Sequence, residues 1–121
     1  MQWKAVSNAM GNIDQALKSA LGMEVTYVTN ASIAGMIAQE LRGATVALEH
    51  RYFGESQPYS NLSTANLKYH TIQQAIDDLD YFAYHVNLPM PDGNHVTPNE
   101  APWILLGCSY AGALTSFTKV K

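Results

Sequence analysis

The chain has 121 residues, of which 47% are hydrophobic and 14% are charged, and it carries a formal net charge of −3 at pH 7. This composition is typical of one globular domain rather than a disordered chain, and the lack of a basic cluster argues against a nucleic-acid partner. No apolar run approaches the roughly 20 residues of a membrane span, so we expect no membrane partner, and the N-terminus lacks the apolar core of a signal peptide.

The first half of the chain predicts two helices, each ended by a glycine. Residues 3–21 and residues 31–42 both carry apolar side chains at helical spacing. In the second helix we expect four side chains to be buried: Ile33, Met36, Ile37 and Leu41. Val25–Val28 is a short β-prone run, and the apolar residues 44–48 predict a buried strand.

A charged and aromatic segment, Glu49–Ser56, follows that strand. Ligands in open α/β sheets bind at the carboxyl ends of the strands, so the segment is a candidate for part of a site. It contains His50, which we expect to be the best candidate for a general base because it stands at a strand end. The default expectation for every histidine is a structural or surface role, and this includes the other three: His70, His85 and His95.

The clearest predicted helix spans residues 71–86. Thr71 and Gln74 have the capping-box spacing, in which each side chain satisfies a backbone N–H group at the helix start. The helix has one continuous apolar stripe, which we expect to be buried. The stripe consists of Ile72, Ala75, Ile76, Leu79, Phe82, Ala83 and Val86.

Three acids of the same helix, Asp77, Asp78 and Asp80, lie off that stripe. Neighbouring carboxylates on a helix point in different directions, so we expect a solvated face rather than a metal site. Residues 87–102 contain four prolines and no apolar period, which predicts a connecting loop.

The segment after this loop carries the most informative motif. Trp103–Leu106 is a short apolar run that predicts a buried strand, and the residues after Gly112 are compatible with a helix. Between them, Gly107, Ser109 and Ala111 form G-x-S-x-A, a nucleophile elbow with alanine in its last position. In such an elbow the serine occupies a strained strand-to-helix turn with its hydroxyl exposed. The alternative is a tight strand–helix connection with an N-capping serine.

The order strand, helix, strand, elbow, helix predicts an α/β fold with a parallel sheet and flanking helices. In α/β hydrolases the catalytic acid and histidine follow the serine along the chain. The twelve residues after Ser109 contain no Asp, Glu or His, so this order is not completed here. His50 is therefore the candidate for an unconventional base.

Three separated segments resemble the prolyl carboxypeptidase family of serine peptidases, the type of lysosomal Pro-X carboxypeptidase, dipeptidyl peptidase II and fungal acid prolyl peptidase. They are Glu49–Ser56, Leu67–Ala75 with Asp78 and Tyr81–Ala83, and Gly107–Leu114. The resemblance runs from about Tyr27 to the last residue. It implies a partial α/β-hydrolase fold with its nucleophile elbow near the C-terminus. Residues 1–24 would form a divergent N-terminal helix, and residues 25–121 the N-terminal part of the catalytic domain.

The resemblance also implies a site and a substrate class. Ser109 would be the acylating nucleophile and the backbone N–H of Tyr110 one oxyanion donor. The substrates would be peptides with proline or another small residue beside the scissile bond, and neither a cofactor nor a metal is implied. The sequons at Asn30 and Asn61 are candidate N-glycosylation sites, which fit a secreted, vacuolar or lysosomal protein.

The chain also departs from the family pattern. The family's Gly-rich loop, expected to supply a second oxyanion donor, should fall near residues 14–24, which do not resemble it, and Cys108 stands where glycine is commoner. We therefore expect the N-terminal piece of a secreted prolyl peptidase, inactive as this chain. The alternatives are a non-catalytic α/β fragment that binds a peptide or partner, and a carboxylesterase-type hydrolase. The Glu49–Ser56 and Leu67–Ala75 motifs argue against the carboxylesterase.

Overall fold

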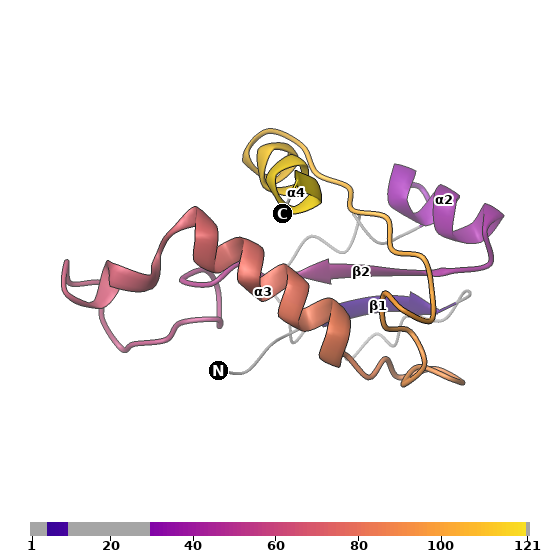
Figure 1. Ribbon diagram of the computed structural model, residues 1–121, viewed down its shortest axis with the longest axis horizontal. Coiled ribbons are helices and arrows are strands. Elements are labelled where there is room, and N and C mark those ends of the chain that lie inside the picture. The colour runs from indigo at the N-terminus through magenta and orange to yellow at the C-terminus, as the bar shows by residue number, and fades with distance from the viewer. Residues whose placement is uncertain (1–4, 10–29, 121) are drawn as a thin grey trace. The chain divides into compact units, whose positions relative to one another are not determined.

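The computed structural model describes residues 5–9 and 30–120. The β-prone run Val25–Val28, most of the expected helix over residues 3–21, and the region 14–24 lie outside them. The chain divides into two compact units, residues 1–57 and 58–121. The described elements are β1 (Ala5–Ala9), α2 (Ile33–Glu40), β2 (Ala44–Leu48), the 3-10 helix η2 (Asn66–Tyr69), α3 (Ile72–His85) and α4 (Tyr110–Val120) (Figure 1).

The first unit contains an antiparallel pair of strands (Figure 1). β1 pairs with β2 in a register that runs from Ala5 opposite Leu48 to Ala9 opposite Ala44. The helical interpretation is therefore wrong for Ala5–Ala9. A short run of small residues is compatible with both the helical and the strand spacing of apolar residues. The backbone hydrogen bonds to β2 decide that this run forms a strand. The predicted parallel sheet is also not found among the described residues, whose two strands are antiparallel.

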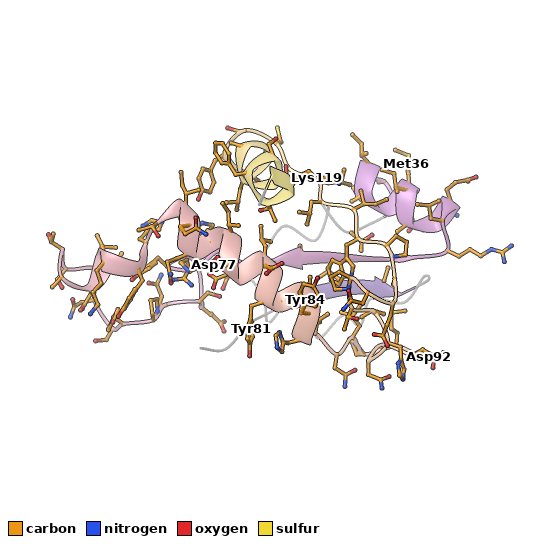
Figure 2. The ribbon with its side chains drawn as sticks, in the orientation of Figure 1. Met36, Asp77, Tyr81, Tyr84, Asp92 and Lys119 are labelled. Carbon is orange, nitrogen blue, oxygen red and sulfur yellow. The ribbon has the colours of Figure 1, made fainter. Side chains whose placement is uncertain are left out.

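Helix α2 begins as predicted, but its apolar side chains are not buried. The hydroxyl oxygen of Ser32 accepts a hydrogen bond from the backbone N–H of Gly35 at 2.9 Å, which caps the helix. Three side chains expected in the core are exposed, by 69% for Ile33, 53% for Met36 and 62% for Leu41. Figure 2 shows the Met36 side chain projecting from the helix.

The side of α2 that is buried carries a small residue instead. Within the first unit α2 contacts β2, and the hydroxyl of Thr45 on β2 donates to the carbonyl oxygen of Ala34 at 3.4 Å. The buried residue of the helix is Gly35. The apolar period locates the helix, whereas the side that is covered depends on the element beside it.

In the second unit, α3 confirms the predicted helix. The hydroxyl of Thr71 accepts from the backbone N–H of Gln74 at 3.2 Å and caps the helix start. α3 packs against α4, and the core cluster of this unit consists of Ala75, Ile76 and Leu114, with Leu79 packed against it.

Two positions of α3 differ from the prediction. Ile72, the first helical residue, is 48% exposed, and Asp78, expected on the solvated face, is only 8% exposed. Ala75, Asp78 and Phe82 lie at i, i+3 and i+7, so they share one row along the helix. The buried face of α3 therefore includes this row, and with it the carboxyl group of Asp78.

The apolar run before the elbow is irregular rather than a strand. Residues 102–108 form neither helix nor strand, and the side chains of Ile104, Leu105 and Leu106 are 55%, 39% and 49% exposed. A strand requires a hydrogen-bonded partner strand, and the described part of the second unit contains none. Trp103 is nevertheless held, because its ring N–H donates to the carbonyl oxygen of Val96 at 2.6 Å.

Candidate functional site

Ser109 lies at the turn that leads into α4. Its φ is +56°, and the residue is exposed. Its carbonyl oxygen accepts the backbone N–H of Ala113 at 3.1 Å, so the helical hydrogen bonds begin at Ser109. A positive φ is uncommon for residues other than glycine and costs on the order of 1–3 kcal/mol. The strained turn expected for an elbow is present, but the segment before it is not a strand.

Close backbone approach explains the small residues on either side of Ser109. A Cβ atom added to Gly107 would overlap the carbonyl group of Ala111 and lie 2.7 Å from the backbone nitrogen of Gly112. A Cβ atom on Gly112 would meet the carbonyl oxygen of Gly107 at 3.1 Å, a tighter contact than side chains usually make. The turn therefore excludes any side chain at position 107 and restricts position 112.

Tyr110 is the first residue of α4 and is 50% exposed. Backbone N–H groups in the first turn of a helix point out along its axis, and the helix dipole favours negative charge there. Ser109 and Tyr110 therefore lie at one helix start together with three small residues, Gly107, Ala111 and Gly112. Cys108 beside them is an exposed free thiol.

The Glu49–Ser56 segment forms a tight turn held by a carboxylate. One oxygen of Glu49 accepts from the backbone N–H of Glu55 at 3.1 Å, and from the N–H and hydroxyl of Ser56 at 2.9 and 2.7 Å. Gly54 has a φ of +51°, and an added Cβ would overlap the Glu49 carboxylate. Glu49 therefore organises this turn, a role that its spacing from Ser56 does not reveal.

The strain of this turn extends to Tyr52, whose φ is +67°. Its backbone N–H donates to the carbonyl oxygen of Ser56 at 2.9 Å, and its own carbonyl oxygen accepts from the side-chain amide of Gln57 at 2.6 Å. Arg51, Tyr52 and Ser56 are all buried. Part of the motif is therefore packed inside the protein, whereas residues 53–55 are exposed.

His50, the candidate base, is half-buried within the same turn. Its Nδ1 lies 2.7 Å from the carbonyl oxygen of Arg51, and its ring meets Phe53 edge-on at 5.3 Å. Because a carbonyl oxygen only accepts, Nδ1 carries the proton and Nε2 is the basic nitrogen of the neutral ring. His50 belongs to the first unit and Ser109 to the second.

Two of the other histidines make local contacts in the second unit. Nδ1 of His85 lies 2.7 Å from the carbonyl oxygen of Tyr81, whose ring stacks on the histidine at 4.0 Å. His95 contacts the carboxylate of Glu100 at 3.2 Å. The pKa of Glu100 is lowered, first by the hydroxyl of Thr97 and then by His95.

The described residues contain no cluster of three or more histidines, cysteines or acids suited to a metal ion. Within the same residues, no helix has the length and apolar content needed to cross a membrane.

Comparison with known sequences gives one family match. Residues 3–121 match the sequence model of the family described as serine carboxypeptidase S28. The match begins well before Tyr27, the start expected from the motifs.

The curated relatives that match this chain include proteins named as serine proteases and carboxypeptidases. The chain is 50% identical over 93 residues to serine protease vicPa of Bipolaris victoriae, an alignment that covers 77% of this chain and 17% of that protein. It is 34% identical to the "Probable extracellular serine carboxypeptidase" of Arthroderma benhamiae, covering 74% and 12%. It is 29% identical to the human lysosomal Pro-X carboxypeptidase, covering 80% and 19%. The chain thus spans less than a fifth of the length of these relatives.

Proposed function

This chain belongs to the serine carboxypeptidase S28 family, which is of the prolyl carboxypeptidase type with an α/β-hydrolase-type fold, and from this premise we propose that it carries the nucleophile elbow of a serine peptidase. The observation that supports the proposal is the turn at Ser109. An exposed serine at positive φ stands directly before a helix, beside a glycine that admits no side chain. A nucleophile elbow requires this combination.

In the proposed reaction Ser109 Oγ attacks the carbonyl carbon of a peptide bond while a base takes its proton. The base then gives this proton to the amine, which leaves, and water hydrolyses the resulting acyl-enzyme. The N–H of Tyr110, at the start of α4, would stabilise the oxyanion that forms during the attack. Ser109 supplies the nucleophile, and the backbone around it supplies one oxyanion donor.

A complete site also needs a base and an acid. None lies among the twelve residues after Ser109, and His50 is the candidate within these 121 residues. His50 is fixed by the carbonyl group of Arg51, with Nε2 as its basic nitrogen. Without a base and an acid in place we expect this chain, taken alone, to lack peptidase activity.

The substrate class and location come from the relatives. One relative is named a Pro-X carboxypeptidase, which suggests peptides with proline beside the scissile bond. The names "lysosomal" and "extracellular" suggest a secreted or lysosomal location. The carboxylesterase alternative shares only the elbow, whereas the family match extends from residue 3 to residue 121.

A chimera tests the proposal in a complete enzyme. The 93 aligned residues of the Bipolaris victoriae relative would be replaced by the matching residues of this chain, which are 50% identical. We expect the chimera to cleave the peptides that the unaltered relative cleaves, and its Ser109→Ala variant to lose activity by about 10⁴–10⁶-fold. Ser60→Ala, in an exposed loop, is the matched control. Full activity after Ser109→Ala would contradict the assignment of the nucleophile.

A further inference from the structure

We propose that Asn61, and not Asn30, is the N-glycosylated asparagine of this chain. The inference rests on the secretory location included in the proposed function, but not on the peptidase reaction. Both residues are exposed and both begin an N-x-S sequon. The two sequons differ in the hydrogen bonds that their side chains make.

The side chain of Asn61 is held in one orientation. Its Oδ1 accepts the backbone N–H of Ser63 at 3.2 Å and the side-chain amide of Asn66 at 2.9 Å. A backbone N–H can only donate, so the amide oxygen must face Ser63. The amide nitrogen, which is the atom that receives a glycan, is therefore directed to the other side.

The surroundings of Asn61 can accept a bulky group. Residues 60–65 are all exposed and form neither helix nor strand. The loop is anchored after the sequon, where the carbonyl oxygen of Ser63 accepts the backbone N–H groups of Asn66 and Leu67 at 2.9 and 3.0 Å. A glycan is large and hydrated and requires a surface segment of this kind.

The turn at Asn61 is local, because the hydrogen bond from Ser63 to Asn61 joins residues only two positions apart. A turn of that size needs no contact with the rest of the fold. It is therefore available while a chain is still entering the secretory compartment, when the oligosaccharide is added.

In the first sequon, the hydroxyl group already makes a hydrogen bond within the protein. The Oγ of Ser32 accepts the N–H of Gly35 at 2.9 Å and caps α2, and Ser32 is half-buried. This contact spans only three residues, so, like the turn at Asn61, it does not depend on the rest of the fold. The sequon requires a hydroxyl at its third residue, so the transferase must have access to that group. The hydrogen bonds described for Ser63 involve only its backbone N–H and carbonyl groups. The hydroxyl of the second sequon is therefore the accessible one.

The transfer is a substitution with a sugar attached to a lipid diphosphate. Nδ2 of Asn61 forms a bond to the anomeric carbon of the sugar as the bond from that carbon to the diphosphate oxygen breaks. The lipid diphosphate leaves with the electron pair, and one amide proton passes to a base of the transferase. No oxidant or reductant is needed.

The test is translation of the full 121-residue chain, behind an added cleavable leader, with eukaryotic microsomes. Only the protease-protected chain is scored, by the change in mobility that an N-glycosidase removes. We expect one such step, which is lost in Asn61→Gln and Ser63→Ala and kept in the matched variants Asn30→Gln and Ser32→Ala. Asn66→Ala should lower the modified fraction, since it removes one of the two contacts that orient Asn61.

Three results would overturn the proposal. They are a protected chain without the step, a step lost in Asn30→Gln, and two steps in the unaltered chain. An unchanged modified fraction in Asn66→Ala would refute the role given to the oriented amide. Because the added leader directs entry, these results do not depend on the location or peptidase activity of the protein. The peptidase activity is tested separately by the chimera.

Discussion

Gly107 is the residue on which the turn before α4 depends most. A methyl group at this position would overlap the backbone of Ala111 and Gly112. We expect Gly107→Ala to lower the free energy of unfolding by about 1–3 kcal/mol, the usual cost of overpacking. Urea unfolding followed by circular dichroism measures the change.

Gly112→Ala is the matched control for that substitution. It lies inside α4, where alanine is favoured over glycine by about 0.8–1.0 kcal/mol. Its contact at 3.1 Å requires only a small displacement of Gly107. We therefore expect a smaller loss than for Gly107→Ala. An equal loss from both substitutions would contradict the close approach at Gly107.

The lowered pKa of the Glu100 carboxyl group can be tested by titration. Its pKa is lowered from the ordinary value of 4.5, because its carboxylate accepts the Thr97 hydroxyl at 2.8 Å and contacts His95. We expect Thr97→Val to raise this pKa, as measured by NMR titration of the carboxyl carbon. Thr64→Val, in another exposed segment, should leave it unchanged.

The direction of the stability effect follows from the lowered pKa. A carboxyl group with a lower pKa in the folded state stabilises that state above the unfolded value, here 4.5. The contribution is lost as the pH falls through the folded pKa. If Thr97→Val left the pKa of Glu100 where it was, the hydroxyl would not be the cause of the shift.

The turn after β2 depends on one carboxylate. All three hydrogen bonds go to one oxygen of Glu49, and Glu49→Gln keeps one oxygen that can accept them but removes the charge that strengthens them. Hydrogen bonds to a charged group contribute about 1.5–3 kcal/mol each, so we expect a loss of at least about 1.5 kcal/mol in unfolding free energy. The measurement is urea unfolding at neutral pH.

Glu40→Gln is the control for this substitution, because Glu40 is an exposed acid at the end of α2. It should change the unfolding free energy by less than about 0.5 kcal/mol. If both substitutions had the same small effect, the Glu49 hydrogen bonds would not stabilise the turn.

The purified 121-residue chain should not hydrolyse a chromogenic prolyl peptide at any pH from about 4 to 8. Loss of a triad member removes most of the rate in serine peptidases, about 10⁴-fold or more. The base and the acid of a triad do not follow Ser109 in these residues. A full-length relative, assayed in parallel, serves as the positive control.

The Ser109→Ala chain distinguishes true turnover from contamination. Turnover that disappears in this variant would refute the expected inactivity and indicate a base within the chain. His50→Ala would then be the next variant, since Nε2 of His50 is the candidate basic nitrogen. Turnover that persists in Ser109→Ala would come from another protein in the sample.

What could be predicted from the sequence is what short-range contacts determine. The cap at Thr71 and the helix α3 behind it involve residues three or four positions apart. The strained turn at Ser109 follows in the same way from Gly107 and Ala111 beside it. The family is likewise indicated by three motifs, each of which lies within one short segment of the chain. The match over residues 3–121 confirms this family.

Only the tertiary structure decided which strands pair and which surfaces are covered. Ala5–Ala9 is a strand because β2 lies beside it, and Trp103–Leu106 is irregular where the described residues offer no partner strand. Asp78 is buried and Met36 exposed although the helical period predicts the reverse. Burial and strand pairing depend on residues far away in the chain, and a periodic pattern records only that a face is apolar, not what will cover it.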